Sequence, residues 1–187
     1  MNRVARKLGY IITQTFYKNR FRDIGSGSLV FKPMQLDSVS SILIGTSVYI
    51  AEGAWLMGNQ KKQETISIGS YTTIGHYAHI VGLHSVKIED NVLIADKVFI
   101  SDCTHSYQEI DIPIIKQDVI ELSPVVIGEG SWLGENVCVC GASIGKHCVI
   151  GANSVVTSDI ADYCVAVGSP AKVVKKYDFI QREWVKV

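Results

Sequence analysis

Residues 68–80 read IGSYTTIGHYAHI, with an isoleucine at every sixth position. The same step of six recurs along most of the chain, in five sets of three aliphatic residues. The sets are Ile44, Ile50 and Leu56; Ile68, Ile74 and Ile80; Ile88, Ile94 and Ile100; Ile127, Leu133 and Val139; and Ile144, Ile150 and Val156. A period of six fits neither an α-helix nor a hairpin meander. It predicts a coil with three short flat faces, each pointing one aliphatic side chain inward.

Glycine follows the aliphatic residue in many of these repeats, and a small residue follows it in others. The glycines are Gly45, Gly69, Gly75, Gly128, Gly134, Gly145 and Gly151. A turn between two flat faces needs a residue that tolerates unusual backbone angles, so we expect these glycines to make the turns. Because three hexapeptides form one coil, the pattern predicts five full coils and partial ones, which bury their aliphatic residues by stacking. Glycine in phase with the repeat argues against a chance alternation in a β-sandwich.

The composition fits one packed domain. The chain has 187 residues, of which 47% are hydrophobic and 19% charged. Its formal net charge of zero argues against nucleic acid as the main partner. The cysteine count is odd and no pair has CxxC spacing, so we expect neither a disulfide framework nor a metal site. No apolar run has the length of a signal peptide or membrane span, so we expect a soluble, cytoplasmic protein.

The N-terminal segment is predicted to be an amphipathic helix over residues 3–20. One face carries Val4, Leu8, Ile11, Ile12, Thr15 and Phe16. Basic residues flank it: residues 1–32 contain seven Lys or Arg and one acidic residue. One interpretation is a cap that covers the open end of the β-helix. The other is peripheral contact with an anionic membrane surface, at the inner face of the membrane.

The repeat is interrupted between Ile100 and Ile127. This break predicts a loop extruded from the wall over about residues 102–123, and loops of that length in a regular solenoid are usually functional. We therefore expect three parts. They are a helical or irregular cap over 1–40, the β-helix over 41–160, and a tail over 161–187 with a short helix around 177–185.

The stretch from Ile88 to Lys176 resembles the hexapeptide-repeat acyltransferases. It is most similar to the branch that contains galactoside, maltose and polysaccharide O-acetyltransferases. The motifs that carry the resemblance are IEDNVLI (88–94), SDCTHSY (101–107), VIG through WLGENV (126–137), IGANSVV (150–156) and GSPAK (168–172). The resemblance implies a left-handed parallel β-helix and a homotrimer with active sites between neighbouring β-helices. It also implies that acetyl-CoA lies along the wall of the coils.

The histidine of the second motif, His105, is implied to be the general base. Acetyl transfer to a hydroxyl needs a base, donors for the developing oxyanion and correct positioning, and a neutral imidazole is available near neutral pH. Asp102 could hold the imidazole through its other nitrogen, as in a triad, or simply make a turn. Cys103 makes a nucleophilic Cys–His pair an alternative, although the family transfers the acetyl group directly. No metal is required.

The resemblance also implies a set of residues that bind acetyl-CoA. Trp132 matches a tryptophan near the reactive end of CoA, and Gly134 and Ala152 match small positions along the pantetheine arm. The remaining matches are Thr157 and Ser158 on the same wall, and Lys172 and Lys175 near the nucleotide phosphates. Galactoside acetyltransferases use an asparagine one coil before the histidine, but Gly75 stands there in this chain.

These observations favour transfer of acetyl from acetyl-CoA to a hydroxyl of a saccharide. The acceptor is expected to be a small sugar or a surface-polysaccharide precursor, free or lipid-linked. N-acetylation of a nucleotide amino sugar is the alternative within the same chemistry. Two alternatives belong to other classes: a non-catalytic β-helix scaffold, and a γ-carbonic-anhydrase-like zinc protein with ligands among His76, His79 and His84.

Overall fold

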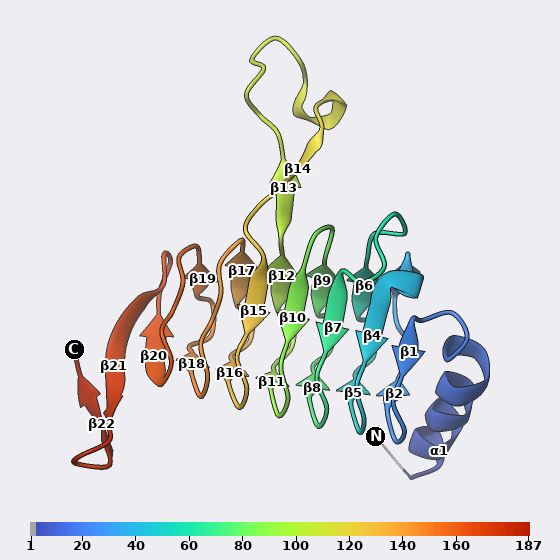
Figure 1. Cartoon of the computed structure of the whole chain (residues 1–187), viewed down its shortest axis with the longest axis horizontal. Helices are drawn as coiled ribbons and strands as arrows, with labels where there is room; N and C mark the ends of the chain where they lie inside the picture. Colours follow the sequence, from blue (N-terminus) through green and yellow to red (C-terminus); the bar gives the residue numbers. More distant parts are fainter. Residues whose placement is uncertain (1–2) are drawn as a thin grey trace.

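The computed structural model describes residues 3–187, apart from the side chains of Arg3, Ala5 and Arg6. The chain winds into a parallel β-helix whose coils stack along one axis (Figure 1). Helix α1 (Arg3–Ile12) lies at one end of the solenoid, and a C-terminal hairpin lies at the other. The predicted parallel β-helix is confirmed.

The strands form three sheets, here called sheets A, B and C, and each of the first five coils contributes one strand to all three. Sheet A contains β1 (Asp23–Ile24), β4 (Ile42–Ile44), β7 (Ile66–Ile68), β10 (Val86–Ile88) and β15 (Val125–Ile127). After β15, sheet A continues only as isolated bridges at Ile144 and Ile160. Sheet B contains β2 (Leu29–Val30), β5 (Tyr49–Ile50), β8 (Thr73–Ile74), β11 (Leu93–Ile94), β16 (Trp132–Leu133), β18 (Val149–Ile150) and β20 (Cys164–Val167). Sheet C contains β3 (Gln35–Asp37), β6 (Trp55–Met57), β9 (His79–Val81), β12 (Phe99–Ser101), β17 (Cys138–Cys140) and β19 (Val155–Val156).

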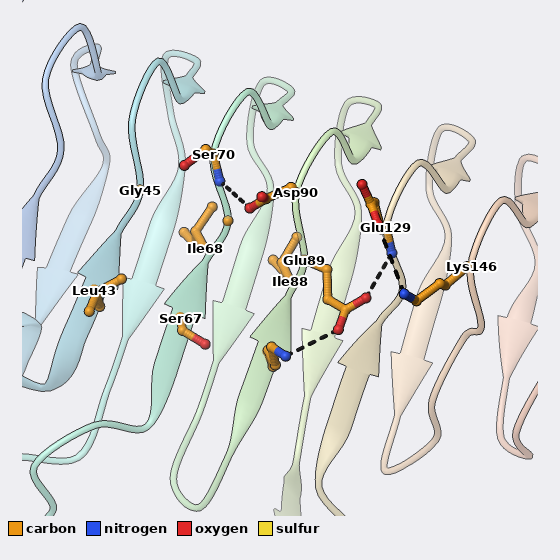
Figure 2. A pocket seen from close by; sticks show the side chains of 12 residues that line it. Leu43, Gly45, Ser67, Ile68, Ser70, Ile88, Glu89, Asp90, Glu129 and Lys146 are labelled. Atoms are coloured by element: carbon orange, nitrogen blue, oxygen red, sulfur yellow. Dashed lines mark hydrogen bonds and ion pairs between the residues drawn. The ribbon is translucent and has the colours of Figure 1, made fainter.

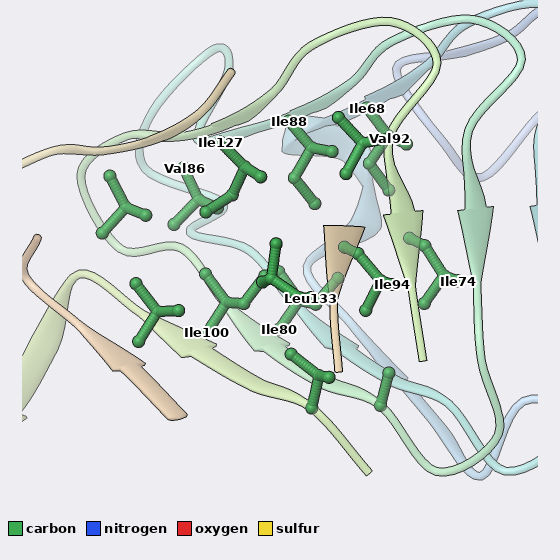
Figure 3. Packing of buried hydrophobic residues seen from close by; sticks show 14 of the residues in the cluster. Ile68, Ile74, Ile80, Val86, Ile88, Val92, Ile94, Ile100, Ile127 and Leu133 are labelled. Atoms are coloured by element: carbon green, nitrogen blue, oxygen red, sulfur yellow. The ribbon is translucent and has the colours of Figure 1, made fainter. Parts of the chain in front are cut away.

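The core is a stack of the aliphatic residues that define the repeat. The parallel pairing sets each inward residue on its counterpart in the next coil, as with Ile68 on Ile88 and Ile74 on Ile94. All fifteen repeat positions are at most 1% exposed, and Figure 3 shows several of them packed inside the coils. Burying one such side chain contributes about 1.5–3 kcal/mol, so the stack supplies most of the stabilisation of the wall.

The turns differ from the expectation. None of the seven glycines predicted to make them has a positive φ. The left-handed residue stands instead three places after the inward aliphatic residue, as at Tyr71 and Asn91. The predicted glycines are required for another reason: a Cβ on Gly128 would lie 2.5 Å from the carbonyl carbon of Gly145 in the next coil. These glycines let the coils approach one another.

The β-helix is longer than the predicted span of 41–160. Strands β1 to β3 form an additional first coil, so the expectation of a cap over residues 1–40 is wrong for residues 23–37. Ile24, Val30 and Leu36 carry its inward positions at the same step of six. At the other boundary β20 still pairs in parallel with β18, beyond residue 160.

The predicted C-terminal helix around 177–185 is also wrong. Strands β21 (Lys172–Asp178) and β22 (Glu183–Lys186) form an antiparallel hairpin that pairs with β20. The free edge of β20 offers unpaired backbone groups, which β21 satisfies. Cross-strand packing of the Tyr177 and Trp184 rings, with centroids 5.4 Å apart, further favours the hairpin.

Helix α1 continues as a π-helix over Thr13–Tyr17, in agreement with the predicted N-terminal helix. It contacts the first coil: the Thr13 hydroxyl accepts a hydrogen bond from the Val30 N–H (3.0 Å). A Cβ on Gly9 would lie 2.9 Å from the side chains of Leu29 and Phe31. Among the described residues, no helix is both long and apolar enough to cross a membrane.

Candidate active site

The predicted extruded loop forms a two-stranded ribbon, here called the ribbon (residues 102–121). Its strands β13 (Cys103–His105) and β14 (Val119–Glu121) pair antiparallel and project from the end of β12 (Figure 1). A 3-10 turn over Ile114–Lys116 lies near its tip. His105 lies opposite Val119, and its side chain is exposed. The ribbon therefore presents an accessible imidazole near its base.

Asp102 has a different role from the one expected. Its side chain is fully buried at the base of the ribbon. One carboxylate oxygen accepts the Leu83 N–H (2.8 Å), and the other accepts those of His84 (2.7 Å) and Ser85 (2.6 Å). Three backbone donors thus use the carboxylate to fix the ribbon to the loop at 83–85. We therefore do not retain Asp102 as the group that orients His105.

A second carboxylate anchors the other strand of the ribbon. Glu121 Oε1 accepts a hydrogen bond from Lys62 Nζ (2.8 Å), and its Oε2 lies 3.5 Å from His84 Nδ1. The Lys62 hydrogen bond lowers the pKa of Glu121. Lys62 and His84 belong to two different coils, so both strands of the ribbon are tied to the wall beneath it. The only sequence signal for this anchor is a lysine pair that interrupts the repeat at 61–62.

The thiol of Cys103 is poorly placed to act as a nucleophile. It is half-buried and lies 3.3 Å from the Ser101 hydroxyl. Burial raises its pKa, which disfavours the reactive thiolate. Cys138 and Cys140 on the neighbouring strand β17 have sulfur atoms 3.5 Å apart, and the hydrogen bond from Cys140 lowers the pKa of Cys138 to about 7. This thiol pair was not anticipated from the sequence.

The three histidines weighed as zinc ligands lie on separate parts of the coils. His76 Nδ1 is 3.1 Å from Asp96 Oδ1 at one corner. His79 stacks on Trp55 in sheet C with ring centroids 4.0 Å apart, and His84 belongs to the anchor of the ribbon. Within residues 3–187, no three His, Cys, Asp or Glu side chains are grouped so that they could hold a metal ion.

Five of the seven residues expected to bind acetyl-CoA lie near the two edges of sheet C. Gly134 and Ala152 stack at the corner between sheets B and C, and Lys172 lies near the same corner, opposite Val167 at the end of β20. Thr157 and Ser158 follow β19 and lie at the other corner of sheet C. The ribbon extends from this same corner after β12, which lies two coils before β19.

The other two expected residues lie on sheet B and its extension. Trp132 projects from β16 and is exposed. Lys175 lies on β21 opposite Val165. Lys172 and Lys175 are both exposed, and neither has an ion pair with a described carboxylate. A single chain therefore presents an indole and two free ammonium groups on the side of the coils away from the ribbon.

A separate open hollow of about 400 Å³ lies on sheet A (Figure 2). Its charged lining is already paired: Lys87 Nζ is 3.1 Å from Glu89 Oε1, and Glu89 Oε2 accepts the Glu129 N–H (3.1 Å). The Lys87 hydrogen bond lowers the pKa of Glu89. None of the site residues expected from the sequence lines this hollow, so it is not part of the candidate site.

Comparisons with known proteins agree with the fold and the motifs. A family model described as "Hexapeptide repeat of succinyl-transferase" matches residues 124–158. The putative lipopolysaccharide biosynthesis O-acetyl transferase WbbJ of Escherichia coli K12 is 36% identical over 183 residues, covering 94% of this chain and 89% of that protein. Galactoside O-acetyltransferase of the same organism is 32% identical over 151 residues, covering 77% and 71%.

Solved structures share the architecture. AntD, an N-acyltransferase from Bacillus cereus solved with dTDP-4-amino-4,6-dideoxyglucose and coenzyme A, superposes with a TM-score of 0.76 at 21% identity, covering 90% of this chain and 91% of that one. A hexapeptide-repeat containing acetyltransferase from Vibrio cholerae, complexed with acetyl coenzyme A, gives a TM-score of 0.61 at 24% identity, covering 94% and 87%. At these identities the likeness concerns the fold.

Proposed function

The chain belongs to the hexapeptide-repeat acyltransferases, and on that premise we propose that it transfers an acetyl group from acetyl-CoA to a hydroxyl of a saccharide. The observation that carries the proposal is the exposed His105 on a ribbon anchored by two carboxylates. Similarity to a lipopolysaccharide O-acetyl transferase over almost the whole chain supports a surface-polysaccharide precursor as acceptor.

The chemical role of His105 is that of a general base. Its neutral imidazole accepts the hydroxyl proton while the hydroxyl oxygen adds to the thioester carbonyl. The carbon–sulfur bond then breaks, and the CoA sulfur leaves with the proton that the imidazole returns. Rigid anchoring of the ribbon favours this chemistry, because the imidazole need not be ordered when the acceptor binds. The raised pKa of Cys103 favours direct transfer over an acetyl-thioester intermediate on that residue.

The wall fits a long thioester with a charged end. Trp132 offers an exposed indole plane to a flat apolar group. The small residues Gly134 and Ala152 let a chain approach the backbone at the corner beside sheet C. The unpaired ammonium groups of Lys172 and Lys175 suit phosphates. Thr157 and Ser158, on the other corner, belong with the ribbon side of the site.

We further propose that the active protein is a homotrimer in which the ribbon completes the site of a neighbouring copy. The ribbon tip carries several exposed apolar side chains, including Ile110 at 95% and Ile115 at 88%. Soluble chains rarely expose such a cluster unless another surface covers it. A neighbouring coil wall supplies that surface, and would bring its Trp132 towards the ribbon that carries His105.

N-acetylation of a nucleotide amino sugar is the second candidate. It is supported by the shared fold of AntD, whose structure contains a dTDP-linked amino sugar. An amine also has to lose a proton during transfer, so His105 would serve this reaction equally well. The two candidates differ in the product, an ester in one case and an amide in the other.

Release of the CoA thiol from acetyl-CoA tests the proposal. The purified protein is incubated with acetyl-CoA and a panel of galactosides, maltose and nucleotide amino sugars, and each product is examined by mass spectrometry before and after mild alkali. We expect an alkali-labile ester on a saccharide. An alkali-stable amide would favour the second candidate. Absence of acetyl-CoA binding and of transfer to every acceptor would instead favour a scaffold, and bound zinc would favour the carbonic-anhydrase alternative.

A further inference from the structure

Helix α1 packs on the coils with its small residues and leaves its large apolar residues outside. Gly9 and Thr13 face the first coil, where Thr13 bonds to Val30. Val4, Leu8 and Ile11 are 76%, 58% and 46% exposed. A helix that only capped the solenoid would bury its apolar stripe against the coil. The capping interpretation therefore accounts for one face of α1 and leaves the other without a function.

The exposed residues form one continuous face. Val4, Leu8 and Ile11 recur at steps of four and three, so they share a side of the helix. After Ile12 the backbone continues as a π-helix, in which the Lys18 N–H bonds to the Thr13 carbonyl (2.9 Å). The wider turn of a π-helix brings Phe16, 69% exposed, round to the same side.

The same segment carries exposed positive charge. Lys7, Lys18 and Arg20 are exposed, and no described carboxylate forms an ion pair with them. The one acidic residue of segment 1–32 is Asp23, whose carboxylate accepts a hydrogen bond from the Ile24 N–H (2.8 Å). An apolar stripe with unpaired cations nearby is complementary to an anionic bilayer, which has an apolar interior and negatively charged headgroups.

We propose that α1 and Phe16 dock on an anionic lipid surface. Val4, Leu8, Ile11 and Phe16 enter the boundary between headgroups and acyl chains, and the lysines and arginine stay at the headgroups. A helix of ten residues is only about 15 Å long, so it lies in the interface and does not cross it. The helix stands at the end of the solenoid opposite the C-terminal hairpin, so the coils extend away from the lipid (Figure 1).

This inference rests on the proposed function and narrows it, because a docked enzyme would meet acceptors that are themselves held in the bilayer. A second copy of the chain is a weaker occupant of the same face. Two copies of α1 placed together would bring their uncompensated cations into proximity, and like charges repel. A lipid surface supplies both the apolar layer and the opposite charge.

Vesicle sedimentation tests the proposal. The full chain is mixed with vesicles of phosphatidylcholine alone, or of phosphatidylcholine with phosphatidylglycerol, at low and high salt. We expect binding to the anionic vesicles that weakens as salt rises. The double variant Leu8→Ser with Phe16→Ser should reduce the partition coefficient by about tenfold or more. The matched control is Ile180→Ser, an exposed isoleucine in the hairpin at the other end of the solenoid, and it should bind as the parent does.

Two results would overturn the proposal. The first is that the parent chain binds neither type of vesicle, or binds the anionic vesicles no better than the double variant does. The other is a double variant with a lower molecular mass in analytical ultracentrifugation, which would make the face an interface between copies. Acetyl transfer to a soluble sugar is measured on the same samples. If the parent chain transfers acetyl to the soluble sugar but binds no vesicles, only the docking proposal is refuted. If the parent chain transfers no acetyl to any sugar, the proposed function is refuted instead.

Discussion

The coil wall and the ribbon tip use the same kind of residue in opposite ways. In the wall, isoleucines such as Ile94 and Ile100 are buried by the coils above and below them. In the tip, Ile110 and Ile115 lie open to solvent. Stacking buries the isoleucines of the wall within one chain, whereas those of the tip have no such cover from the described residues. In the proposed homotrimer a neighbouring copy would cover the tip, so the proposed function would depend on that copy.

The largest expected effect is on the ribbon. His105→Ala should lower turnover by about 10²–10⁴-fold, because the proposed general base is lost. Unfolding should not change, since the side chain is exposed and the anchors at Asp102 and Glu121 remain. Steady-state kinetics with the acceptor identified by the thiol assay measure this. Gln108→Ala, another exposed position of the ribbon, serves as control. Unchanged turnover in the His105 variant would remove the imidazole from the mechanism.

Truncation of one isoleucine in each region makes the comparison quantitative. Ile94→Ala should lower the free energy of unfolding by about 2–5 kcal/mol, because it leaves a cavity between stacked coils. Ile115→Ala should cost little in an isolated chain. If the ribbon tip is covered in a homotrimer, that variant should lower the urea midpoint measured at high protein concentration and make the midpoint depend less on concentration, because association stabilises the fold less. Equal losses from both variants at high dilution would contradict the exposed tip.

Within the wall, the glycines at the coil contacts and the residues in the turns should respond with opposite signs. Gly128→Ala should destabilise the fold by about 1–3 kcal/mol, because the new Cβ forces two backbones apart. Lys97→Gly should stabilise it by up to about 1 kcal/mol, because Lys97 holds a φ of 59° that glycine adopts without strain. Thermal unfolding of both variants tests the assignment. A neutral Gly128→Ala would show that the coils have room to adjust.

The smallest effect concerns pH. Burial lowers the pKa of His79, and its Nε2 has no hydrogen-bond partner. Between the lowered value and the ordinary one the unfolded chain binds more protons, so stability rises with pH and is lost as pH falls below about 6.5. His79→Phe keeps the stacking between Trp55 and Phe99 and should remove this dependence, with a gain of at most about 1 kcal/mol at acid pH. Unfolding midpoints of the parent and of His79→Phe are measured at several pH values. If both proteins lost stability equally as pH falls, His79 would not be the cause of the pH dependence.

The period of six predicted the core because it reports directly which side chains point inward. It could also have revealed the first coil, since Ile24, Val30 and Leu36 follow it, but only Ile24 is followed by a glycine, so the signal is weaker there. The period does not report backbone angles, so it misassigned the glycines. The C-terminal helix failed for a tertiary reason: the segment from Lys172 pairs with the free edge of β20, which no local pattern reveals.

The candidate site was predictable only where a motif marked it. The motif located His105 at the base of the extruded segment, and the antiparallel ribbon there agrees with it. Adjacency in sequence could not tell where the Asp102 side chain points, and it turns to the loop at 83–85. The anchor of Lys62, His84 and Glu121 joins three segments far apart in the chain. The lysine pair at 61–62 marks one of these segments as irregular, but it does not identify the partners of Lys62.

The stacking of whole coils fixes the height of the ribbon above the end that carries α1. Sheet C proceeds from β3 through β6 and β9 to β12, from which the ribbon extends. Neighbouring strands are about 4.8 Å apart, so these three steps span roughly 14 Å. If α1 rests on a bilayer as proposed, this spacing would select acceptors by the length between their lipid and their sugar. Adding or deleting one coil before β10 would move His105 by about 5 Å and shift that selection accordingly.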